Sequence, residues 1–213
     1  MPALVVGDLD HARHLAHQNL RVLGNAVRDG YTIVCSEPTA ALMLQREYPR
    51  LTDDLDAALV AANTCDVGDY LIGLQARGSL PAPTHPLRAR VGYHQPCHLR
   101  ALGQGTPGLD LIRAIPEIDV EFIDRGCSGM AGTFGLGRNH FRTSRRAGRG
   151  LLNRLRDDDI DIGATECGAC RMQMEQGMRK RTFHPIKLLS LAHGHNPSLR
   201  QHFKDAKPKH MVF

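Results

Sequence analysis

The segment Ile160-Asp-Ile-Gly-Ala-Thr-Glu-Cys167-Gly-Ala-Cys170 contains a predicted strand followed directly by a predicted helix. Its first four residues, Ile160 to Gly163, have the composition of a short buried strand, and a helix is expected to begin near Cys167. Strands and helices alternate in the same way along the rest of the chain. This alternation predicts an α/β architecture with mostly parallel strands.

The expected elements fall into two units. The first unit holds a helix over 8–29, a strand over 31–35, and helices over 38–47 and 54–76. The second holds strands over 89–93, 119–123 and 160–163, with helices over 109–115 and 139–156, from Cys167, and after His184-Pro185. Three prolines and a glycine in 78–86 predict a linker between the units. We therefore expect units at 1–80 and 88–195, a linker at 81–87 and a polar tail at 196–213.

The composition is typical of a folded protein that stays in the cytoplasm. The 213 residues are 42% hydrophobic and 23% charged, which is enough apolar material for a core. No apolar run approaches the roughly 18 residues of a membrane span, and residues 1–18 lack the apolar core of a secretory signal. The net charge is +5, but the arginines are dispersed and aromatic residues are only 5%, so we expect no nucleic-acid binding.

Four of the six cysteines follow expected strands at one edge of the sheet: Cys97, Cys127, Cys167 and Cys170. Ligand sites in parallel sheets form at the carboxyl ends of strands, and paired cysteines two residues apart can bind one metal centre. Four thiolates at one edge predict a metal or iron–sulfur site. Cys35 and Cys65 lie outside this pattern, and we expect them to be buried as small apolar residues.

A glycine-rich loop surrounds Cys127. Glycine recurs at every third position from Gly126 to Gly135, and without a Cβ atom Gly129 and Gly132 let the backbone approach a cofactor and donate N–H groups to sulfur. The loop lacks the Gly-x-Gly start of a dinucleotide fingerprint and the Gly-Lys-Ser/Thr of a P-loop.

Three motifs together resemble a known family. Tyr93-His-Gln-Pro-Cys97-His98, Cys127-Ser-Gly129-Met-Ala-Gly-Thr-Phe-Gly135 and Glu166-Cys167-Gly-Ala-Cys170 are similar to the cysteine-rich domain in the B-subunit of heterodisulfide reductase. The likeness is closest to the C-terminal part of the C-subunit of anaerobic glycerol-3-phosphate dehydrogenase and to the iron–sulfur parts of glycolate and D-lactate oxidising systems. It is dense over residues 90–191 and moderate over 31–51.

The chain departs from the family pattern in both of its repeats. The second repeat has Cys127-Ser128 where the family has a double cysteine. The first repeat has Glu37 and Ala40 where the paired cysteines stand, and its opening segment is absent. The resemblance therefore implies two βα repeats, of which the first is degenerate, truncated and without metal ligands. It implies one metal site, in a chain that is compatible with being a piece of a longer polypeptide.

The resemblance also implies electron transfer. Relatives pass electrons from a flavin-dependent dehydrogenase for glycerol 3-phosphate, glycolate or D-lactate to a quinone or another acceptor. Because this chain has no flavin fingerprint, we expect a non-catalytic redox subunit or domain that associates with a flavoprotein subunit or fused domain. It would reach a membrane only peripherally, through its partners.

Three classes of cofactor chemistry stay open for the cysteines. Four thiolates are the number that a cubane [4Fe–4S] cluster needs, and this is our leading interpretation. Zinc on the same four cysteines would make a structural or interaction module. Thiol–disulfide exchange at Cys167 and Cys170 is a third interpretation, which leaves Cys97 and Cys127 unexplained.

Several residues near the cysteines are candidates to surround the cofactor. His94 and His98 flank Cys97, Ser128 follows Cys127, and Glu166 either caps the helix after it or faces the cluster. The helix over 139–156 carries six arginines, which form either a solvated face or a docking face for an acidic partner: Arg142, Arg145, Arg146, Arg149, Arg154 and Arg156.

Overall fold

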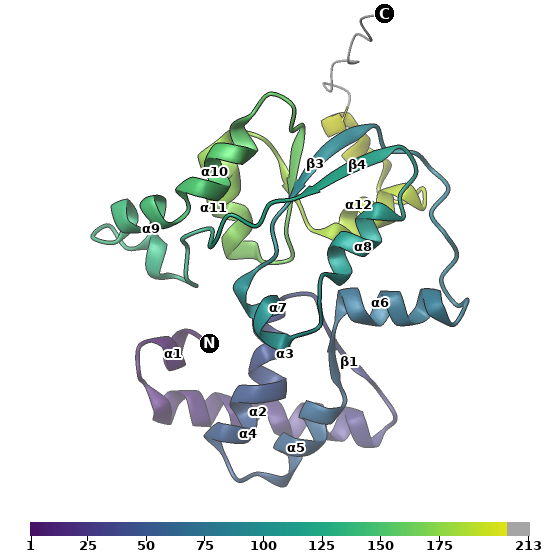
Figure 1. Cartoon of the computed structure of the whole chain (residues 1–213). Coiled ribbons are helices and arrows are strands. Elements are labelled where there is room, and N and C mark those ends of the chain that lie inside the picture. The colour runs from purple at the N-terminus through teal and green to yellow at the C-terminus, as the bar shows by residue number, and fades with distance from the viewer. Residues whose placement is uncertain (204–213) are drawn as a thin grey trace, which may run out of the picture.

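Parallel strands organise the computed structural model of this protein, which describes residues 1–203 (Figure 1). A small sheet pairs β1 (Ile33–Cys35) with β2 (Thr64–Asp66). A larger sheet has the order β4 (Ile118–Phe122), β3 (Ala89–Tyr93), β5 (Ile162–Ala164) and β6 (Thr182–Phe183). Every pair in both sheets is parallel, so the predicted α/β architecture is confirmed.

The N-terminal lobe packs helices around the small sheet. Its α-helices are α1 (Pro2–Val5), α2 (Leu9–Arg28), α3 (Pro38–Leu42), α4 (Tyr48–Leu51), α5 (Leu55–Ala62) and α6 (Val67–Ala76), with a π-helical turn over Met43–Glu47. Asp8 caps α2 by accepting a hydrogen bond from the backbone N–H of His11. The buried side chains of Leu20, Ala41 and Val60 contribute to the core of this lobe.

The single helix expected over 54–76 is wrong, because β2 divides it into α5 and α6. The hydroxyl of Thr64 donates to the carbonyl of Val60, 2.7 Å away, where α5 ends. Asp66 then caps α6 by accepting from the N–H of Gly68 at 2.8 Å. Thr64 and Asp66 thus offer the backbone hydrogen bonds that compete with a continuous helix.

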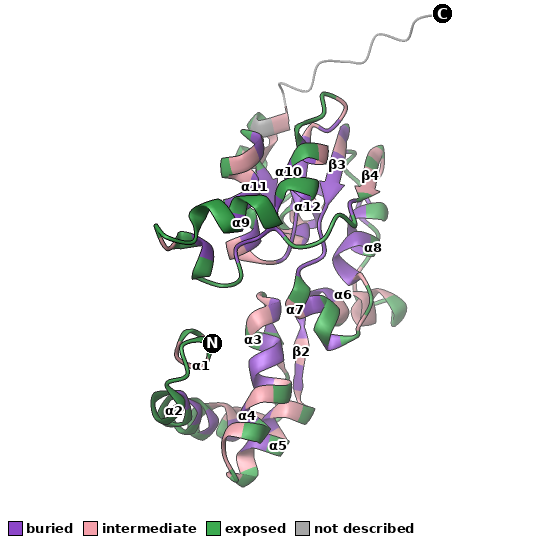
Figure 2. Ribbon diagram, turned by 60° about the vertical axis from the view of Figure 1, so that its left-hand side comes forward, coloured by how far each residue is buried: buried purple, intermediate pink, exposed green. Residues whose placement is uncertain are grey.

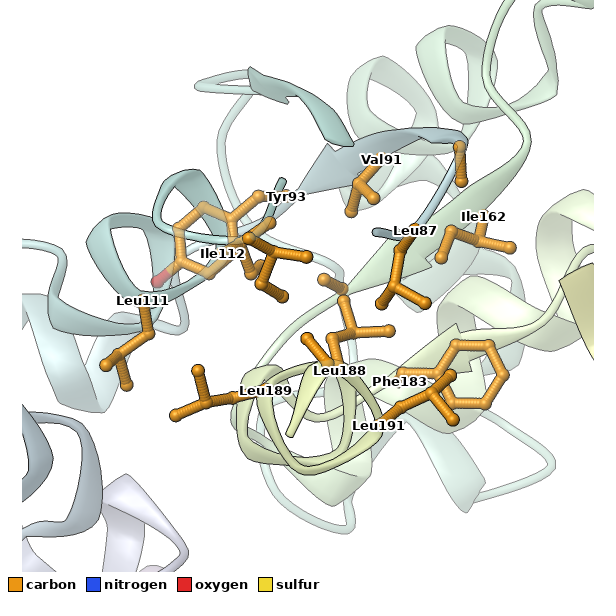
Figure 3. Close-up of a cluster of buried hydrophobic side chains, with 14 of the residues drawn as sticks. Leu87, Val91, Tyr93, Leu111, Ile112, Ile162, Phe183, Leu188, Leu189 and Leu191 are labelled. Carbon is orange, nitrogen blue, oxygen red and sulfur yellow. The ribbon is translucent and has the colours of Figure 1, made fainter. Parts of the chain in front are cut away.

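The C-terminal lobe contains the helices α7 (Cys97–Leu102), α8 (Pro107–Arg113), α9 (Phe141–Ala147), α10 (Arg149–Arg156), α11 (Gly168–Met178) and α12 (Pro185–Ala192). The larger sheet packs against α8, α10, α11 and α12, whereas α7 packs against α3. Figure 3 shows the core between the sheet and the helices α8 and α12, where Val91, Ile112 and Leu188 are buried. A second core, with Leu151 and Met174, joins α10 and α11 to this lobe.

Two segments of this lobe differ from the expectations. The helix expected over 139–156 divides at Gly148 into α9 and α10, and short 3-10 helices lie at Phe134–Leu136 and Pro197–Phe203. The second of these begins the expected polar tail, of which residues 204–213 lie outside the described residues. None of the helices in residues 1–203 has the length and hydrophobicity of a membrane-spanning segment.

The two lobes meet where the strands of the larger sheet end. There α7 packs against α3, and Figure 1 shows α7 at the junction. The rings of His98 and His184 bind the other lobe, through the Thr39 hydroxyl at 2.7 Å and the Ser36 carbonyl at 2.9 Å. The strand edge that carries the cysteines therefore faces the junction between the lobes.

Candidate metal centre

The four candidate cysteines lie just past the ends of three neighbouring strands. Cys97 is the first residue of α7, four residues beyond the end of β3. Cys127 lies in the loop after β4, and Cys167 and Cys170 stand at the N-terminal end of α11, beyond β5. Because these strands are parallel neighbours, their carboxyl ends bring the cysteines to one edge of the sheet.

The thiols influence one another electrostatically across this edge. Desolvation raises the pKa of Cys97, and the thiols of Cys127 and Cys167 raise it further. Among residues 1–203, no three or more Cys, His, Asp and Glu side chains form a group that could hold a metal ion. In the described part of the chain, the cysteines are linked by these charge interactions and by hydrogen bonds to their sulfur atoms.

Cys167 and Cys170 form a coupled pair at the start of α11. A hydrogen bond from the Cys170 thiol lowers the pKa of Cys167 to about 7, and backbone N–H groups at the helix start contribute to the same shift. The same bond, together with burial, raises the pKa of Cys170. Cys167 therefore reaches the thiolate form needed for metal binding near neutral pH.

The loop around Cys127 places two donors on cysteine sulfur. The hydroxyl of Ser128, which is fully buried, donates to the sulfur of Cys170 at 3.1 Å. The backbone N–H of Gly129 donates to the sulfur of Cys127 at 3.2 Å. Hydrogen bonds of this kind stabilise charged thiolates and tune the potential of a bound cluster. Gly132 has a positive φ of 67°, and a Cβ atom at this position would have no other atom within 4 Å.

The helices α9 and α10 pack directly against this loop. A Cβ atom on Gly129, whose φ is +95°, would overlap the carbonyl oxygen of Ser144, and one on Gly148 would overlap that of Ser128. The Ser144 hydroxyl in turn accepts a hydrogen bond from the side-chain amide of Gln173, on α11, at 3.1 Å. These glycines are needed because the two backbones approach so closely.

A buried carboxyl group lies beside Cys167. Glu166 is 2% exposed and accepts a hydrogen bond from the Tyr93 hydroxyl at 2.8 Å. Burial raises the pKa of Glu166 to about 8, and the neighbouring charges of Asp66 and Cys167 contribute in the same direction. At neutral pH this group is therefore largely protonated and adds little negative charge to the site.

The two histidines beside Cys97 have other surroundings. His94 is buried, its backbone N–H donates to the carbonyl of Ala164, and burial with the nearby Arg100 lowers its pKa to about 4. His98 hydrogen-bonds with Thr39 of the N-terminal lobe. The described interactions of the two rings do not involve a cysteine, so in the structure His98 serves to join the lobes.

Glu37 reaches the site from the N-terminal lobe, and it was not among the predicted site residues. Its carboxylate accepts a hydrogen bond at 2.8 Å from the backbone N–H of Gly168, the residue after Cys167, and its charge acts to raise the pKa of Cys167. A signal was available, because Glu37 aligns with a cysteine position of the degenerate repeat.

The other two cysteines lie in the small sheet. Cys35, in β1, is buried, and burial with the nearby Asp66 raises its pKa to about 11. The Cys65 thiol, in β2, contacts the carbonyl oxygen of Ile33 at 3.8 Å. Cys35 thus lies in the core as a small apolar residue, whereas Cys65 is only partly buried.

The sequence is similar to a known family of cysteine-rich domains and to several characterised proteins. Residues 91–175 match the family model of the CCG cysteine-rich domain. The chain is 28% identical over 193 residues to the C-subunit of anaerobic glycerol-3-phosphate dehydrogenase from Escherichia coli, a match that covers 90% of this chain and 48% of that protein. It is 26% identical over 194 residues to the B-subunit of fumarate reductase (CoM/CoB) from Methanothermobacter marburgensis, covering 89% and 36%.

A third relative is named as an iron–sulfur protein. An uncharacterised iron–sulfur protein of Methanocaldococcus jannaschii is 27% identical over 97 residues, covering 45% of this chain and 19% of that protein. The chain thus spans about half or less of the curated relatives it matches. The matched family segment includes Cys97, Cys127, Cys167 and Cys170. All four candidate cysteines therefore lie inside the segment that is similar to the CCG cysteine-rich domain.

Proposed function

We propose that this chain is an iron–sulfur electron-transfer module. It would carry one [4Fe–4S] cluster on Cys97, Cys127, Cys167 and Cys170. The observation that carries the proposal is the placement of these four cysteines at one strand edge within a cysteine-rich domain. The relation to subunits of a dehydrogenase and a reductase, and to an iron–sulfur protein, supports it.

The residues around the thiols fit a cluster of this kind. Thiolates are the ligands of iron–sulfur clusters, and Cys167 is poised to lose its proton near pH 7. Ser128 and Gly129 supply hydrogen bonds to two of the four sulfurs. The protonated Glu166 keeps a further negative charge away from ligands that already carry several. When bound, the cluster would supply one-electron redox chemistry, and these groups would set its potential.

The proposal includes partners on both sides of the electron path. We infer that a flavin-dependent dehydrogenase, as a separate subunit or a fused domain, gives electrons to this chain. Dehydrogenases for glycerol 3-phosphate, glycolate or D-lactate are the candidates that the family resemblance suggests. The chain then passes electrons to a quinone or another acceptor in the cytoplasm or at a membrane surface.

Metal analysis with spectroscopy of the anaerobically purified chain tests the cofactor. We expect about four irons per chain, visible absorption that bleaches on reduction, and an EPR signal of the reduced protein. Changing Cys97, Cys127, Cys167 or Cys170 to Ala should remove the iron, and Cys35→Ala and Cys65→Ala are the matched controls that should retain it. A colourless protein with one bound zinc would contradict the proposal and establish the zinc module instead.

One observation favours a second candidate function. A thiol with a lowered pKa that begins a helix, paired with a buried thiol of raised pKa, is also the arrangement of a thiol–disulfide oxidoreductase. The same preparations decide between the two. Disulfide reduction by the iron-free chain that survives Cys97→Ala and Cys127→Ala, but not Cys167→Ala, would favour this second candidate.

A further inference from the structure

A basic groove runs along α9 and α10, beside the loop that holds Cys127. It has a volume of about 720 Å³, and five arginines line it: Arg142, Arg145, Arg146, Arg149 and Arg156. All five are exposed, and Figure 2 shows α9 as a largely exposed helix. Phe141 and Leu152 add apolar surface to the groove.

The charge of this groove is not balanced by carboxylates from the described part of the chain. Arg154, which points elsewhere, forms ion pairs with Glu121, Asp157 and Asp159. No ion pair within residues 1–203 involves the five groove arginines. Arg145 lies over the ring of Phe141, 6.0 Å from its centroid, and Arg156 donates to the carbonyl of Gly177. Several like charges that repel one another are thus held side by side on short helices, which favours an acidic ligand.

The groove is physically joined to the cysteine loop. Arg145 follows Ser144, whose backbone packs on Gly129. Arg149 follows Gly148, whose backbone packs on Ser128. The opposite side of the same two helices therefore supports the residues that hydrogen-bond to the sulfurs of Cys127 and Cys170. A molecule seated in the groove would therefore contact helices that also contact the cysteine loop.

We propose that this groove is the docking surface for an acidic redox protein that exchanges electrons with the chain. The inference rests on the proposed electron-transfer function and adds to it the site and the charge of the partner. Guanidinium groups bind carboxylates through paired hydrogen bonds, and opposite charge raises association rates about 10- to 1,000-fold at low ionic strength. The contact with the cysteine loop favours a redox protein over nucleic acid, because only an electron carrier benefits from that position.

Stopped-flow reduction by an acidic flavodoxin tests the proposal. One electron passes from flavodoxin hydroquinone, which becomes the semiquinone, to the anaerobically prepared full chain. We expect Arg145→Glu/Arg149→Glu to slow this reaction at least 10-fold at low ionic strength, and the difference to shrink as salt screens the charges. The matched control is Arg21→Glu/Arg77→Glu, which makes the same charge change at exposed arginines of the N-terminal lobe and should change the rate less than 2-fold.

Two further measurements separate the outcomes. Reduced methyl viologen should bleach the groove variant to the same extent as the native chain, which shows that the variant is folded and loaded. Flavodoxin binding measured by fluorescence anisotropy needs no cluster, so it decides the proposal even if the chain carries no iron and the proposed function fails. Equal flavodoxin rates and affinities for the native chain and the groove variant would overturn the proposal. A groove variant that loses affinity only for a DNA duplex would overturn it in favour of nucleic acid.

Discussion

The hydroxyl of Ser128 gives the sharpest test of the proposed ligand set. In the family pattern this position is a cysteine, whereas here a buried hydroxyl donates to the sulfur of Cys170 at 3.1 Å. If four thiolates hold the cluster, Ser128→Ala should leave the iron content nearly intact. The variant should instead lower the reduction potential, because the lost hydrogen bond stabilises the more negative, reduced state more than the oxidised one.

The size of the shift follows from the geometry. A hydrogen bond to a charged acceptor contributes about 1.5–3 kcal/mol. Because the added electron is shared among the cluster and its four thiolates, we take only about a third of that energy, ~0.5–1 kcal/mol, as the difference between the two redox states. For a one-electron couple, 1.4 kcal/mol corresponds to about 59 mV. We therefore expect the potential to fall by about 20–40 mV.

An anaerobic redox titration followed by EPR measures this shift. Ser144→Ala is the matched control, because it also removes a buried hydroxyl, but one that accepts a hydrogen bond from Gln173 and not one that donates to sulfur. Both variants should lose about 1 kcal/mol of stability, and only Ser128→Ala should change the potential.

Two results would refute this reasoning. Loss of iron from Ser128→Ala as complete as the loss from Cys127→Ala would make the hydroxyl a ligand. Equal potential shifts in Ser128→Ala and Ser144→Ala would mean that packing, and not the bond to Cys170, sets the potential.

Three further predictions concern the surroundings of the site. Gly129→Ala, at a φ of +95° and against the carbonyl of Ser144, should lower the free energy of unfolding by about 2–5 kcal/mol, while Gly126→Ala, at +82° but in open space, should lower it by about 1–2 kcal/mol in urea titrations. Burial raises the pKa of Asp66 to about 6, so ionisation of this carboxyl lowers the free energy of unfolding as the pH rises from about 4 to 6. Asp66→Asn should therefore increase the free energy of unfolding by about 1–3 kcal/mol at pH 8 and leave it unchanged at pH 4. Glu37→Gln should keep the bond to the N–H of Gly168 but raise the reduction potential, because a negative charge leaves the neighbourhood of Cys167.

The strands that carry the cysteines could be predicted from the sequence. The strand expected at 89–93 matches β3, and those at 119–123 and 160–163 lie within two residues of β4 and β5. Their apolar, β-branched runs between turn residues mark them locally. Since Cys97, Cys127 and Cys167 follow these strands, their meeting at one edge is a consequence of parallel pairing.

Contacts between distant segments could not be predicted in this way. The bond from Gly168 to Glu37 joins residues 131 positions apart, and the division of the basic helix at Gly148 depends on the approach of Ser128 from another element. The three-residue strand β2 depends on pairing with β1, and it is too short to show a periodicity of its own. Local periodicity carries no information about such partners.

The N-terminal lobe contributes to the candidate site although it holds none of the four candidate ligands. At the position that aligns with a cysteine of the complete repeat, Glu37 binds the start of α11 beside Cys167. Thr39 and Ser36 bind the rings of His98 and His184 in the other lobe. The N-terminal lobe thus contacts the strand edge of the other lobe and places one negative charge near the cysteine pair. A lobe without metal ligands of its own can in this way still influence the potential of the neighbouring site.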